Sequence, residues 1–74
     1  MKPSIGRIVH YKNTEAEKAF QAGAEVSAAI VTRVWSDTVV NLSIFVDGVD
    51  FISRKSSIGQ GSNPGQWDWP ARVE

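Results

Sequence analysis

The stretch TVVNLSIFV, residues 38–46, constrains the fold more than any other, because apolar and polar residues alternate along it. Successive side chains of a β-strand point to opposite faces, so this pattern predicts a strand with one buried face. The apolar face holds Val40, Leu42, Ile44 and Val46. Asn41 and Ser43 lie on the polar face together with Phe45, which either extends the core at a corner or is exposed for contact.

Two earlier segments, residues 5–11 and 26–35, are also predicted to be strands, because β-branched and aromatic residues are frequent in them. The second segment connects to the alternating stretch through a turn at Ser36 and Asp37. Three consecutive strands with a short connection favour an antiparallel sheet.

The pair Asp47-Gly48 is the strongest hairpin signal in the chain. It predicts a type I′ turn, in which both central residues have positive φ. The strand that follows is VDFIS, residues 49–53, with Val49 and Phe51 on one face.

Residues 54–65, RKSSIGQGSNPG, show no periodicity and predict a long mobile loop, a kind of segment that is often functional. A closing strand, QWDWPARV, follows at residues 66–73. One face of this strand holds Trp67, Trp69, Ala71 and Val73. Pro70 cannot donate a hydrogen bond to a neighbouring strand, so the closing strand is predicted to be an edge or to end its pairing there.

A short helix is predicted near residues 15–22. Thr14 and Glu17 have the spacing of a capping box, and Gly23 favours the left-handed conformation that ends helices. Phe20 is expected to anchor this helix in the core. An ordered loop of similar length is the alternative, because short helices are marginally stable without tertiary packing.

These elements predict an all-β domain spanning residues 1–74, a small SH3-like barrel of five antiparallel strands, with an OB-like barrel as the alternative. A chain of 74 residues has room for one core only. It contains no cysteine and one histidine, which excludes disulfides and thiolate metal sites and leaves no cluster suited to zinc. We expect neither a metal nor a cofactor.

Eight basic and eight acidic residues give a formal net charge of zero. Duplex nucleic acid is therefore not an expected partner, since neutralising phosphates dominates that kind of binding. No apolar stretch approaches the roughly 20 residues of a membrane-spanning helix, and the first residues lack the core of a signal peptide. We expect a cytoplasmic protein that does not contact membranes.

Candidate binding residues come from two regions. Trp67 and Trp69 either complete the core or form a stacking surface for a flat ring or an extended peptide. Arg54 and Lys55, with the serines that follow, could bind a phosphate through charge-assisted hydrogen bonds, or could be a solvated loop base.

His10 and Tyr11 are neighbours in a predicted strand and therefore point to opposite faces, so one is packed and the other is available to a ligand. No nucleophile or orienting carboxylate stands at a recognisable spacing from His10. We therefore predict a protein that is not an enzyme.

The motifs GRIVHY, AAIVT, NLSIFV and GQWDWP together resemble a family of small, mostly uncharacterised proteins of bacteriophages and prophages. In the W-H-W-P pattern of that family, Asp68 takes the place of the usual histidine and Ala71 follows where glutamate is usual. The resemblance implies a phage origin and a small β-barrel. Together with the cytoplasmic location expected above, a phage origin makes the host cytoplasm the expected compartment.

The combined expectation is a phage-encoded binding module, a homo-oligomer that sequesters a small nucleotide-derived ligand such as an immune signal. In this interpretation Tyr11, Trp67 and Trp69 stack on the ligand, and Arg54 and Lys55 meet its phosphate. Asn41 and Ser43 read the edges of its ring, and His10 contacts it. The alternative is a protein-interaction or virion-accessory module that docks a host or phage protein through the Trp-rich patch, and single-strand nucleic-acid binding is a weaker third option.

Overall fold

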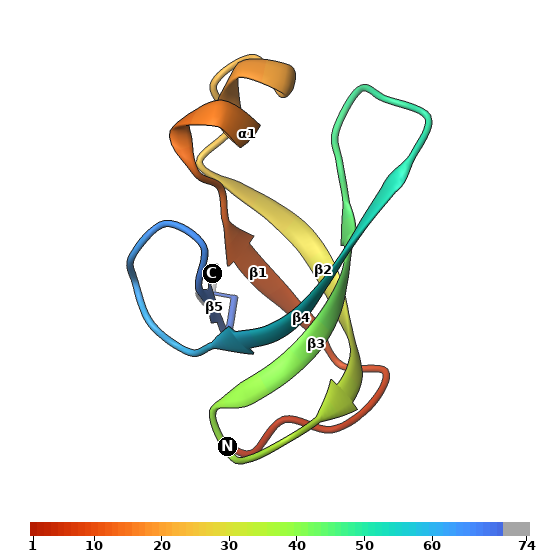
Figure 1. Ribbon diagram of the computed structural model, residues 1–74, viewed down its shortest axis with the longest axis vertical. Helices are drawn as coiled ribbons and strands as arrows, with labels where there is room; N and C mark the ends of the chain where they lie inside the picture. The colour runs from red at the N-terminus through yellow and green to blue at the C-terminus, as the bar shows by residue number, and fades with distance from the viewer. Residues whose placement is uncertain (71–74) are drawn as a thin grey trace.

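A computed structural model describes residues 1–70 of the chain. It contains five strands and one short helix, β1 (Ile8–Lys12), α1 (Glu15–Phe20), β2 (Val26–Val34), β3 (Val39–Phe45), β4 (Ile52–Gly59) and β5 (Trp67–Asp68). The strands form one antiparallel sheet in the order β4-β3-β2-β1-β5. Figure 1 shows this sheet curling into a half-barrel, which confirms the predicted small all-β barrel with a short helix.

The core lies on the inner face of the curled sheet. Its buried apolar residues are Val9, Tyr11, Ala29, Val31, Val40, Leu42, Ile44 and Trp67. The predicted alternation is confirmed within β3, where Val40, Leu42 and Ile44 are buried, whereas Val46 lies beyond the end of the strand and is half-buried. Phe45 points to the other face and is 44% exposed, so it does not extend the core.

The two ends of the sheet approach each other where the chain just after β4 lies beside β5. Gln60 and Trp67 form an isolated parallel bridge, and the N–H of Gly61 donates to the Trp67 carbonyl at 2.9 Å. The Trp67 indole is fully buried, and its Nε1–H donates to the Thr38 carbonyl at 3.0 Å. The closing strand therefore completes the core, as one of the two interpretations of Trp67 predicted. Residues 71–73 of the predicted strand lie outside the described residues.

The capping box predicted for α1 is present. The Thr14 hydroxyl accepts from the Glu17 N–H, and the Glu17 carboxylate accepts from the Thr14 N–H. The predicted anchor is wrong, because Phe20 is 72% exposed. The helix is held instead by polar contacts, since Gln21 is buried and accepts hydrogen bonds from the Ser27 hydroxyl at 2.6 Å and the Asp47 N–H at 3.1 Å.

The connection between β3 and β4 is longer than predicted. Gly48 has a positive φ of 78°, but Asp47 does not, so the turn is not type I′. The connection covers residues 46–51, and the predicted strand 49–53 begins only at Ile52. Phe51 lies in the connection and is 58% exposed.

The predicted mobile loop over residues 54–65 is also wrong in its first half, where the chain forms β4. This strand is an edge with one unpaired side, so polar residues in it remain in contact with water. A β-bulge lies opposite Asn41, and Ser57 within it has a φ of 57°. The bulge shifts the alternation of side chains, which removes the period-two signal from the sequence.

Candidate functional site

The residues predicted to bind a ligand separate into three groups in the structure. Tyr11 and Trp67 belong to the core and are at most 2% exposed, so neither ring has a free face for stacking. His10 and Trp69 line one surface hollow. Asn41, Ser43, Arg54 and Lys55 line another. The structure therefore does not bring all of these residues together in one binding site.

The second hollow, which we call the β3 hollow, lies over β3 between its two neighbouring strands. Its volume is about 360 Å³, and its lining residues are Thr32, Asn41, Leu42, Ser43, Arg54, Lys55 and Ser56. Ser43 and Arg54 are direct cross-strand partners, which explains why residues far apart in the sequence meet here. The hollow thus gathers the polar face of β3 and the basic pair that sequence analysis singled out separately.

Two irregularities in the sheet flank the β3 hollow. The register between β2 and β3 shifts between Val31 and Arg33, and that between β3 and β4 shifts beside Asn41. Bulges bend strands and re-aim side chains, and they are frequent beside binding sites. Here they interrupt the regular strand pairing on both sides of Asn41.

The Asn41 amide is held in place from both sides. Its Oδ1 accepts a hydrogen bond from Trp35 Nε1 at 2.7 Å and another from the Ser57 N–H at 2.9 Å. Trp35 is itself covered on one side by Arg33, whose guanidinium carbon lies 3.9 Å from the ring centroid. With its oxygen occupied, the amide keeps its NH₂ group as a donor toward a ligand.

The β3 hollow has the donors of an anion site. Its lining residues include three hydroxyls, the Asn41 amide and the Arg54 guanidinium, and no carboxylate is among them. Arg54 forms no ion pair within residues 1–70, whereas Lys55 pairs with Glu17 at 3.4 Å. Arg54 is therefore the cation available to a ligand in this hollow.

The hollow that contains His10 and Trp69 is less suited to an anion. Its volume is about 210 Å³, and Asp68 is one of its lining residues. Trp69 packs edge-on against Trp67 with 5.4 Å between ring centroids, and the Arg7 guanidinium lies 5.2 Å from the Trp69 ring centroid. Trp69 thus packs partly against the core and partly against the Arg7 guanidinium, which limits the ring surface open to a ligand.

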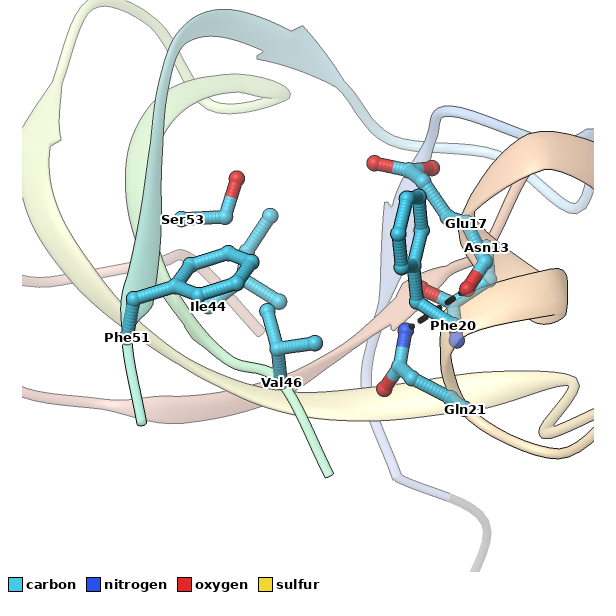
Figure 2. A pocket seen from close by; sticks show the side chains of 8 residues that line it. All are labelled: Asn13, Glu17, Phe20, Gln21, Ile44, Val46, Phe51 and Ser53. Atoms are coloured by element: carbon cyan, nitrogen blue, oxygen red, sulfur yellow. Dashed lines mark hydrogen bonds between the residues drawn. The ribbon is translucent and has the colours of Figure 1, made fainter. Parts of the chain in front are cut away.

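A third pocket, which we call the Phe pocket, opens between α1 and the connection from β3 to β4. Its volume is about 170 Å³, and its lining residues are Asn13, Glu17, Phe20, Gln21, Ile44, Val46, Phe51 and Ser53. Figure 2 shows the Phe20 ring facing Phe51, Ile44 and Val46 across the open space. The two phenylalanines that sequence analysis assigned to the core and to a strand face are instead the walls of this pocket.

Glu17 at the rim of the Phe pocket connects α1 to the sheet. Its carboxylate accepts from the Thr14 N–H at 2.8 Å and the Tyr11 hydroxyl at 2.9 Å, and it pairs with Lys55. Partial burial is the largest single influence and opposes ionisation, but these hydrogen bonds and the Lys55 charge outweigh it, so the pKa of Glu17 lies below its usual range. Burial, followed by the contact with Glu17, raises the pKa of Tyr11.

Arg33 and Trp35 were not among the site residues predicted from the sequence. A signal was present, because residues two apart in a strand share a face, and an arginine and a tryptophan at that spacing can stack. Their link to Asn41 could not be found, since it depends on the register between β2 and β3.

Comparisons with known proteins leave the chain without an assigned family, since no family model, curated protein or solved structure matches it. Within the described residues, no helix is long and apolar enough to cross a membrane, and no group of three or more potential metal ligands occurs.

Proposed function

We propose that this protein is a binding module for a small phosphorylated ligand of the nucleotide class, and that the β3 hollow holds the phosphate. The observation that carries the proposal is the lining of the hollow, which combines three hydroxyls, an oriented amide and an arginine that has no ion pair within residues 1–70, without a carboxylate. Each of the other two pockets described above has an acidic residue in its lining.

Arg54 supplies the charge in this proposal. Guanidinium groups bind phosphate oxygens through two parallel N–H bonds, and such charge-assisted bonds are stronger than neutral ones. Ser43, directly opposite Arg54 on the neighbouring strand, supplies a hydroxyl donor, and the Asn41 NH₂ group supplies another. The hollow of about 360 Å³ is within the range of small-molecule sites, about 300–1,000 Å³.

The lining of the β3 hollow favours binding over catalysis. General bases are most often imidazole or carboxylate groups, and neither is present among its lining residues. Lys55 is engaged with Glu17, so it is a poor candidate for a nucleophile. A phage origin remains a prediction from the sequence resemblance, and a role in sequestering immune signals remains a prediction from the aromatic and basic residues.

Native mass spectrometry of the protein against a panel of mono-, di- and cyclic nucleotides tests the proposal. We expect one ligand per chain, with retention reduced at least tenfold by Arg54→Ala, since charge-assisted hydrogen bonds contribute about 1.5–3 kcal/mol. Lys2→Ala is the matched control, because it removes one cation at an exposed position outside the hollow and should leave retention unchanged. Equal loss in both variants would show non-specific charge attraction, and no retention of any nucleotide would refute the proposal.

A further inference from the structure

The neutral net charge of this chain conceals a separation of charge along the molecule. Figure 1 places α1 and the β3–β4 connection at one end of the long axis, and the N-terminus with the β2–β3 turn at the other. The first end consists of residues 13–25 and 46–51, which carry five carboxylates and one lysine and so have a net charge of −4. The ion pair between Lys55 and Glu17 reduces the net charge of this end to −3. Residues 1–7 and 33–37 at the second end carry three cations and one carboxylate, a net charge of +2.

Each end also exposes apolar side chains. The acidic end carries the Phe pocket, with Phe20 72% and Phe51 58% exposed. The connection that holds Phe51 also contains Asp47 and Asp50, which form no ion pair within residues 1–70. The basic end carries Trp35, which is 51% exposed.

We propose that the Phe pocket of one molecule receives the Trp35 corner of a second copy, so that the chain associates head to tail. This inference goes beyond the proposed function, because it uses a different pocket. The pocket of about 170 Å³ is large enough for the six-membered ring of the Trp35 indole, since an apolar cavity of about 150 Å³ binds benzene. The Arg33 guanidinium, 3.9 Å from the Trp35 ring centroid, would enter beside Asp47 and Asp50 and provide the charge complement.

The alternative route to self-association, pairing of exposed β4 edges, is less favourable. β4 carries Arg54 and Lys55 near its middle, and antiparallel pairing of two copies would bring these charges close to their counterparts. Like charges opposite each other destabilise strand pairs, and charged residues are a common means of blocking edge pairing.

Head-to-tail contacts have a consequence that separates them from symmetric ones. A contact that joins two different surfaces leaves one of each surface free, so association continues into closed rings or open chains. The contact should also weaken with salt, because the Debye length falls from about 30 Å at 0.01 M to about 3 Å at 1 M ionic strength.

Sedimentation velocity at high micromolar protein concentration and low ionic strength tests this inference. We expect species larger than a dimer, which dissociate at high salt. The variants Arg33→Glu and Phe20→Ser/Phe51→Ser each alter one exposed surface and should be monomeric. Lys12→Glu is the matched control, since it changes the net charge as Arg33→Glu does but lies in β1, outside the Phe pocket and the Trp35 corner, and it should associate like the wild type.

Mixing the two monomeric variants gives the decisive result. The phenylalanine variant keeps an intact basic end, and the Arg33→Glu variant keeps an intact Phe pocket. One molecule of each can therefore form a single contact and leaves no second intact surface, so the mixture should form dimers and nothing larger. A wild-type protein that stays monomeric or stops at a dimer would overturn the inference. So would a mixture that remains monomeric. Because ligand retention depends on Arg54 and association depends on Arg33 and the two phenylalanines, failure of either proposal is distinguishable from failure of the other.

Discussion

Replacing Trp67 by phenylalanine is expected to lower the free energy of unfolding by about 2–3 kcal/mol. The indole is fully buried and donates a hydrogen bond to the Thr38 carbonyl. Phenylalanine lacks two of the ring carbons, at about 0.8 kcal/mol for each buried carbon, and the N–H, at about 1 kcal/mol for the hydrogen bond. A domain of 74 residues has a total stability of about 4–11 kcal/mol, so the variant should still fold.

Urea denaturation followed by circular dichroism measures this change. With a slope of about 1 kcal/mol per molar urea for a small domain, the midpoint should fall by about 2–3 M. Trp35→Phe is the matched control, because it removes the same atoms from a side chain that is 51% exposed. Water can replace its lost partner, so the control should change stability by less than about 1 kcal/mol. If Trp67→Phe lowers stability no more than the control does, Trp67 does not close the core as described.

Three further predictions concern α1 and its contacts. Because the folded-state pKa of Glu17 is lowered, the ionised carboxylate stabilises the fold above its unfolded pKa of about 4.3, and this stability is lost as pH falls through the folded pKa. The stability gap between wild type and Glu17→Gln should therefore be full at neutral pH and shrink in acid, and a gap that is constant with pH in urea melts would contradict the role of Glu17. The raised pKa of Tyr11 predicts that its hydroxyl stays protonated in alkali until the protein unfolds, which ultraviolet titration of the phenol can follow. Early smooth ionisation would disprove the burial of the hydroxyl and its contact with Glu17. Ala22 has a φ of 53°, which glycine adopts more easily than alanine, so Ala22→Gly should stabilise the protein by about 0.5–1 kcal/mol in thermal melts. Ala19→Gly inside α1 should instead destabilise it by about 1 kcal/mol. A stability change of the same sign in both variants would refute the left-handed conformation of Ala22.

Much of the fold could be predicted from local patterns. The alternation in residues 38–46 identified β3 and its buried face, and the Thr14–Glu17 spacing identified the capping box. Such features depend on residues that are close in the sequence. The start of β4 could not be placed, because the bulge at Ser57 breaks the period and because Asp47-Gly48 belongs to a longer connection than its composition suggested.

The candidate site was predictable only in part. Asn41 and Ser43 were placed on one face of a strand, and this face proved to lie beside Arg54, but the cross-strand register that joins them is not visible in the sequence. The stacking residues were assigned by their type. Burial decides whether an aromatic ring is free, and burial of Trp67 and Tyr11 depends on how the two ends of the sheet meet.

The most direct test of the central claim is a nitrogen-15 NMR titration with a nucleotide that native mass spectrometry shows to bind. We predict that the largest shift changes fall on the backbone and side-chain amides around the β3 hollow, including the Asn41 side-chain NH₂ and the Ser57 N–H, and that Arg54→Ala abolishes them. Shift changes centred on His10 and Trp69, with the β3 hollow unaffected, would contradict the proposed site.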